Sequence, residues 1–137
     1  MTNRVMQVAA FWLFVLSVTG QSLAASLDAL QGAWTMEGTE CGDTFKNIGG
    51  RIEFNDQGSS LNTGIIIRGA TITGPLATCT IQNIRQMQNH FSARLTCSDA
   101  IIFGSISESF RIVDENKFER FDAEFPDFST AYYRCVF

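Results

Sequence analysis

The sequence has very little of what metal and acid–base chemistry require. Among its 137 residues there are one histidine, His90, and two prolines. A single histidine cannot build a zinc site by itself, and no Gly-x-Ser-x-Gly motif supplies a nucleophile for it to activate. A glycine-rich phosphate loop is absent as well. We therefore interpret His90 as a solvated turn residue. We predict that the protein is not an enzyme and has no catalytic residues, no metal and no cofactor.

The long apolar run of the chain lies near its N-terminus. Residues 5–18 are almost entirely apolar, they follow Arg4, and small residues lie just beyond at 22–25. This order is typical of a secretory signal peptide. The run is shorter than the roughly 18–20 residues that a membrane-spanning helix needs. We predict a signal peptide at residues 1–25 and a periplasmic or secreted single domain at residues 26–137, with no membrane span after cleavage.

Clustered positive charge is also missing. Without Arg4, nine of the 10 basic residues remain against 14 acidic ones, which gives a net charge of about −5. The arginines are dispersed and no polybasic run occurs. This composition argues against nucleic acid and anionic membrane surfaces as partners.

Four cysteines lie in the predicted domain: Cys41, Cys79, Cys97 and Cys135. An even number in a small exported domain is typical of disulfides. A zinc site is the alternative, but no C-x-x-C spacing supports it.

Residues 77–97 contain two strand-type runs around a polar turn, and each run carries a cysteine. A hairpin register that places Cys79 opposite Cys97 puts both on one mostly apolar face and leaves a short loop at residues 87–89. Four cysteines allow three pairings. The register favours Cys79–Cys97, which leaves Cys41–Cys135.

Short strand-type runs recur about every ten residues along the rest of the domain, with turn residues between them. This spacing predicts an all-β sandwich or barrel. The short connections favour a small closed barrel of about eight strands, stapled by the two disulfides.

The first strand of this barrel begins with Gly32-Ala33-Trp34. A Gly-x-Trp start resembles lipocalins, avidin-like proteins and the small bacterial inhibitors of secreted metalloproteases. The resemblance implies an up-and-down, lipocalin-like barrel in which Trp34 packs across the closed end. In the inhibitor family the free N-terminal residues enter the active site of the target, so the resemblance marks Ser26 and Leu27 as binding residues.

The chain also resembles small exported proteins of alphaproteobacteria. The likeness rests on GAW near the start, a C-x-x-x-F element, a T-C-T-I strand and a closing Y-Y-R-C. It covers most of the predicted domain and implies no activity.

Two candidate polar residues stand out in the predicted strands. On the even-numbered face of residues 100–113, Glu108 is the exception among apolar neighbours. If Glu108 and Arg68 both pointed inward, they would form a polar anchor in an apolar ligand pocket. We favour a register shift at Gly104 that turns Glu108 outward to a surface arginine. A carboxylate pair of Glu108 with Glu119 or Asp122 is the enzymatic alternative.

Residues 118–128 interleave four phenylalanines with acids. Phe118 and Phe121 should fall on opposite strand faces, so one of them should be exposed. Phe125 and Phe128 lie in a loop, and exposed they would make a protein-docking surface, because interfaces favour aromatics. We favour the alternative, in which the loop folds over the barrel mouth and buries its own phenylalanines.

These observations predict an exported, non-enzymatic protein-binding module whose partner is a protein of the envelope or medium, for example a secreted hydrolase that it inhibits. The alternative is a carrier of a small apolar ligand of lipocalin or avidin type, because a barrel of about eight strands can hold one small ligand. A third hypothesis is a structural envelope protein.

Overall fold

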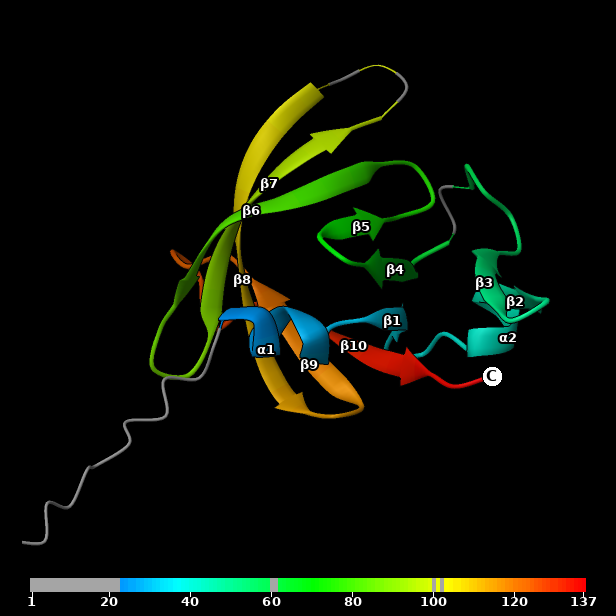
Figure 1. Ribbon diagram of the computed structural model, residues 1–137, viewed down its shortest axis with the longest axis horizontal. Coiled ribbons are helices and arrows are strands. Elements are labelled where there is room, and N and C mark those ends of the chain that lie inside the picture. The colour runs from blue at the N-terminus through cyan, green and yellow to red at the C-terminus, as the bar shows by residue number, and fades with distance from the viewer. Residues whose placement is uncertain (1–22, 60–61, 100, 102) are drawn as a thin grey trace, which may run out of the picture.

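The computed structural model describes residues 23–59, 62–99, 101 and 103–137 (Figure 1). Most of the predicted signal peptide lies outside these residues. So does Ile102, one of the apolar neighbours of Glu108 on the even-numbered face of residues 100–113. Helix α1 (Leu23–Ala29) spans the predicted cleavage point. In the described part of the chain, no helix is long and apolar enough to cross a membrane.

The structure is a closed antiparallel barrel, as the spacing of strand-type runs predicts. Eight strands follow the order β1-β10-β9-β8-β7-β6-β5-β4. Apart from an insertion between β1 and β4, each strand pairs with its neighbours in the sequence, so the barrel is of the up-and-down type. The strands are β1 (Gly32–Met36), β4 (Ile65–Arg68), β5 (Thr71–Thr73), β6 (Thr78–Gln86), β7 (Phe91–Ser98), β8 (Phe103–Asp114), β9 (Lys117–Phe121) and β10 (Ser129–Cys135).

Large side chains fill the barrel. The rings of Trp34 and Phe118 meet edge to face with centroids 4.8 Å apart, and Phe118 stacks on Tyr132 at 5.0 Å. Phe91 stacks on Phe110 at 5.2 Å. These five side chains lie at 3% exposure or less. Such contacts stabilise the barrel beyond the effect of burying apolar area.

The insertion between β1 and β4 packs on the outside of the barrel. It consists of α2 (Cys41–Thr44) and the hairpin of β2 (Phe45–Ile48) and β3 (Arg51–Phe54), which Figure 1 shows together at one side. Phe45 and Phe54 join Ala33, Ile66 and Cys135 in a second apolar cluster. A side chain at Gly64 would collide with Thr44 and Phe45, so only glycine permits this close approach.

Both disulfides form as the cysteine pattern favours. Cys79–Cys97 joins β6 to β7, and Cys41–Cys135 ties the insertion to the last strand. The hairpin register is confirmed from Cys79 to Gln82. It then shifts by one residue, so Gln86 pairs with Phe91 and the loop covers residues 87–90, one residue more than predicted. Asn83 has a φ of 50° within this irregularity, a conformation that asparagine tolerates better than most residues.

One end of the barrel is closed around Trp34. Its indole N–H donates to the Leu30 carbonyl at 2.8 Å, and the Arg134 guanidinium lies 4.1 Å from the ring centroid. Arg134 also donates to the carbonyls of Ala29, Gln31 and Glu115 at 2.8, 2.5 and 2.6 Å. Arg134 therefore links the end of α1, the segment after it and the β8–β9 turn to Trp34 at the closed end.

We expect the Cys41→Ala/Cys135→Ala variant to lose more stability than the Cys79→Ala/Cys97→Ala variant. The sequence separations are 94 and 18 residues, and chain entropy predicts losses of about 4.5 and about 3 kcal/mol. Urea unfolding of both variants measures the difference. Equal losses of stability, or a larger loss without Cys79–Cys97, would contradict the expectation that the disulfide closing the longer loop stabilises the protein more.

Arg134→Ala should lower the free energy of unfolding by about 2–4 kcal/mol, because it leaves three carbonyls without their charged donor and uncovers Trp34. Arg134→Lys should recover only part of the loss, since an ammonium group cannot reproduce the planar fork. The exposed Arg51 provides the matched control, and its alanine variant should change stability by less than about 0.5 kcal/mol. Chemical denaturation measures the free energies of unfolding of these variants. If Arg51→Ala lost as much stability as Arg134→Ala, the hydrogen bonds of Arg134 would have no special stabilising role.

Candidate functional site: the barrel mouth

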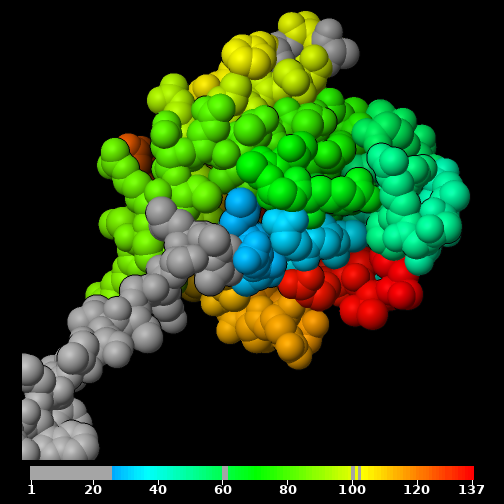
Figure 2. Space-filling model, viewed as in Figure 1, coloured from blue at the N-terminus to red at the C-terminus, as the bar shows by residue number. Residues whose placement is uncertain are grey.

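The opposite end of the barrel, which we call the mouth, lies where β8 extends beyond β9. Strand β8 has 12 residues and β9 has five. Residues 103–108 of β8 pair with β7, and β9 begins to pair only at Ser109. The β7–β8 hairpin therefore stands out above the rest of the barrel (Figure 2). The loop at residues 122–128 leaves β9 beside it.

Glu108 lies on the inner face of the barrel. The β7–β8 register runs without a shift from Phe91↔Phe110 to Ser98↔Phe103, and Glu108 pairs with Ala93, a buried core residue. Directly opposed residues of an antiparallel pair share one face. The favoured register shift at Gly104 is therefore wrong, because Gly104 sits opposite Cys97 in an unbroken ladder.

Arg120, and not Arg68, is the partner of Glu108. The Arg120 Nε lies 3.8 Å from the Glu108 Oε2, and its guanidinium lies 5.8 Å from the Tyr132 ring centroid. Arg68 points to the outside of β4, where it donates to the Ile52 carbonyl of β3. The candidate pair of Arg68 and Glu108 is therefore not formed.

Burial shifts two titrations at the mouth. It raises the pKa of Glu108; Arg120 opposes this effect and Asp122 adds to it. Burial also raises the pKa of Tyr132, with Arg120 lowering it and Glu108 raising it further. The proposed partner Glu119 lies elsewhere, on the outer face, with its carboxylate 2.9 Å from Arg111.

A recess of about 600 Å³ opens beside β8 at the mouth. Three carboxylates line it and none of its lining residues is basic. The lining residues are Ser92, Ile106, Ser107, Glu108, Ser109, Asp122, Ala123 and Glu124. The carboxylates therefore suit the recess to a cationic group and disfavour an anion, and Ile106 and Ala123 add apolar surface to it.

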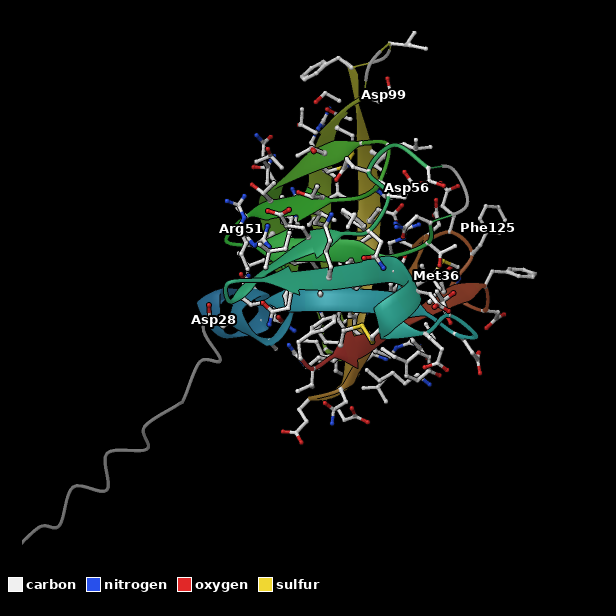
Figure 3. The ribbon with its side chains drawn as sticks, turned by 90° about the vertical axis from the view of Figure 1, so that its right-hand side faces the viewer. Asp28, Met36, Arg51, Asp56, Asp99 and Phe125 are labelled. Carbon is white, nitrogen blue, oxygen red and sulfur yellow. A yellow bond between two sulfur atoms is a disulfide. The ribbon has the colours of Figure 1, made fainter. Side chains whose placement is uncertain are left out.

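The loop at residues 122–128 exposes its two phenylalanines. Phe125 is 58% exposed and Phe128 is 80% exposed, so the interpretation that the loop buries them is wrong. Figure 3 shows Phe125 projecting from the surface. Backbone hydrogen bonds from Phe125 to Asp122 and from Phe128 to Phe125, both 3.0 Å, tighten the loop into successive turns. This local bonding fixes the loop without a cover from the barrel.

Phe118 and Phe121 are both buried, although the strand alternation predicted one exposed ring. Phe118 lies in the core at 0% exposure, and Phe121 lies on the outer face at 4%. The Arg111 guanidinium covers the Phe121 ring at 4.7 Å, and the His90 ring meets it at 5.3 Å. His90 thus lies in the β6–β7 turn, partly buried against Phe121, and its Nδ1 is 2.8 Å from the Asn89 Oδ1.

The N-terminal candidates lie at the closed end, within α1. The Ser26 hydroxyl donates to Gln86 at 2.9 Å, and Leu27 packs against the barrel core. The structure therefore separates Ser26 and Leu27 from Phe125 and Phe128, which lie at the other end.

The fold and the mouth define a small, disulfide-bonded, eight-stranded up-and-down β-barrel. No protein-family model, curated protein or solved structure matches the chain. Among the described residues, no group of three or more histidine, cysteine or acidic side chains is arranged to hold a metal ion.

The raised pKa of Glu108 predicts a pH-dependent stability. The folded state holds its proton more tightly than the unfolded state. The penalty for ionising Glu108 is therefore absent below the ordinary glutamate pKa and develops as the pH rises through the raised value. Between about pH 4 and pH 7, the wild type should lose at most about 1 kcal/mol relative to Glu108→Gln, because solvent at the mouth screens the charge.

Urea unfolding of both proteins across this pH range measures that difference. Glu124→Gln, which removes a neighbouring carboxylate of the same recess, is the control and should track the wild type. If the wild type instead lost stability relative to Glu108→Gln as the pH fell, the pKa of Glu108 would be lowered and its ion pair with Arg120 would dominate.

Proposed function

We propose that the protein is an exported, non-enzymatic protein-binding module that docks its partner at the mouth. The observation that supports this proposal is the exposure of Phe125 and Phe128 on a loop held between β9 and β10. Aromatic side chains contribute most to interface energies when they enter a partner's pocket. The loop's own backbone hydrogen bonds, from Phe125 to Asp122 and from Phe128 to Phe125, restrict its conformation, which lowers the conformational entropy lost on binding.

Export is supported by the two disulfides, because such bonds persist in oxidising compartments. The N-terminal sequence pattern agrees with the same conclusion. We assign the protein to the periplasm or to the medium outside the cell.

For the partner we propose a protein of the same compartment, with inhibition of a secreted hydrolase as one form of the function. The segment that contacts it is the loop at residues 122–128 rather than Ser26 and Leu27. Leu27 is partly buried against the apolar core and would have to leave it to enter a target's active site, at a cost below that of a fully buried leucine, about 1.5–3 kcal/mol. Deleting Ser26 and Leu27 should therefore weaken folding and leave binding by the folded fraction intact.

The carrier alternative needs open space inside the barrel. The interior instead holds the packed rings of Trp34, Phe91, Phe110, Phe118 and Tyr132. The recess at the mouth holds three carboxylates beside the apolar side chains of Ile106 and Ala123, and these charges disfavour a purely apolar ligand. A native mass spectrum of the protein from its exported fraction separates the two: a reproducible added small-molecule mass would favour a carrier.

Site-specific photo-crosslinking tests the docking surface. A benzophenone side chain at position 128 should give one adduct of defined mass in the exported fraction of the host, and the Phe125→Ser variant should suppress it by roughly tenfold. The same probe at position 137, which replaces a residue 50% exposed and packed near Phe45, is the matched control and should give no such adduct.

Equal adducts at positions 128 and 137, or none at 128, would contradict the proposal. Phe125→Ser and Phe128→Ser should change the free energy of unfolding by less than about 0.5 kcal/mol, because both side chains are exposed. Unfolding curves of the two variants therefore show whether a lost adduct reflects lost binding.

A further inference from the structure

We propose that the free edge of β8 accepts an extended, basic segment of the partner as an added β-strand. The proposal rests on the protein-binding function above and names the chemistry of the partner. It uses the backbone of residues 103–107, together with the three carboxylates of the recess.

This edge is open because β9 is too short to cover it. In the described residues, β8 pairs residues 103–108 with β7 alone, and β9 joins the ladder only from Ser109 onward. Figure 1 shows the upper part of β8 without a neighbour on the β9 side. A strand with one uncovered edge presents a row of unpaired N–H and C=O groups that can template another chain.

One hydrogen bond fixes which backbone groups point outward. The Ile81 N–H donates to the Ala70 carbonyl at 2.7 Å, so odd-numbered residues of this part of β6 face β5 and even-numbered ones face β7. In β7 the backbone groups of even-numbered residues therefore point to β6, and those of odd-numbered residues such as Leu95 point to β8. Because Leu95 pairs with Ile106, the backbone groups of the even-numbered residues of β8 point to β7. The odd-numbered residues of β8 therefore face the open side.

The spacing of the central disulfide supports this alternation. The Cα atoms of Cys79 and Cys97 are 4.0 Å apart, at the short end that is typical of a non-hydrogen-bonded pair. The backbone N–H and C=O groups of Phe103, Ser105 and Ser107 are thus directed to the open edge. Five residues of strand are about 17 Å long, enough for a short partner strand.

The recess lies along this edge and not on one face of the strand. It is lined by Ile106 and Glu108 from the inner face and by Ser107 and Ser109 from the outer face. Residues of both faces can line one recess where the neighbouring strand is missing. A partner strand there would continue the position of β9.

Charge selects a basic segment. Glu108, Asp122 and Glu124 line the recess, and Arg120 compensates only the first of them through the contact at 3.8 Å. Lysine or arginine on alternate positions of an added strand would lie beside these carboxylates. The edge segment of a second copy, residues 103–107, has no basic side chain, so pairing with it would leave these carboxylates uncompensated.

A peptide-binding measurement tests the proposal. The probe is a heptapeptide of alternating valine and lysine with a fluorescein at its C-terminus, titrated with the oxidised protein and followed by anisotropy. The wild type and Ser107→Ala should bind it equally. Ser107→Pro, which lacks the outward N–H, should bind at least roughly tenfold more weakly. A peptide with glutamate for lysine should also bind at least roughly tenfold more weakly.

Thermal unfolding establishes that Ser107→Pro is folded, and Ser105→Pro serves as a second variant at the same edge. Equal binding to a folded proline variant would overturn strand addition, as would no binding of the lysine peptide to the wild type. Equal binding of the glutamate peptide would overturn the charge argument. A wild-type dimer in sedimentation that Ser107→Pro abolishes would assign the edge to a second copy instead.

The position-128 crosslink separates this proposal from the function on which it rests. If Ser107→Pro loses the lysine peptide but keeps the crosslink, the partner docks through the phenylalanines alone and strand addition to it is overturned. If the wild type gives no crosslink and still binds the lysine peptide, the docking loop is overturned and the edge stands.

Discussion

Closure of the backbone ladder is the constraint on which the structure depends. Strand β1, only five residues long, pairs with β10 on one side and β4 on the other. Without β1, the edges of β10 and β4 that now pair with it would be left without a neighbouring strand. Trp34 holds this strand from inside the barrel, and the charge of Arg134 holds Trp34 and the segment after α1. The insertion and its disulfide cover β1 from outside, so both faces of the closing strand are packed.

Some strand segments have a hydrogen-bonded neighbour on one side only, and the ladder is not closed there. Every barrel strand has two neighbours over part of its length, but β6 continues past the end of β5 and β8 continues past the end of β9. The apolar inner face continues along this projecting hairpin as far as Ile106, which is 49% exposed. A carboxylate, Glu108, interrupts that face at the level where the barrel ends. Its half-buried ion pair with Arg120 marks the boundary between the filled interior and the recess.

The residues of the mouth come from separate parts of the sequence and from different physical causes. Phe125 and Phe128 are exposed because the loop satisfies its own backbone by tight turns and does not need the barrel. The recess lies between the start of this loop and β8. The aromatic loop and the open strand edge thus both begin where β9 ends at Phe121, and protein recognition is the role that we propose for both.

Alternation along single strands, which is local, predicted the strand-rich class and the register around Cys79 and Cys97. The closed barrel was favoured by the short connections and by the resemblance at Gly32 and Trp34. Cys41–Cys135 was the pairing that remained once Cys79 was paired with Cys97. Three features became apparent only in the folded chain: Glu108 faces inward to Arg120 rather than to Arg68, the Phe125 loop is exposed, and β8 has a free edge. The reason is that the partner of a charge and the cover of a loop depend on strand lengths and on which segments meet across the barrel. Alternation within one strand does not contain that information.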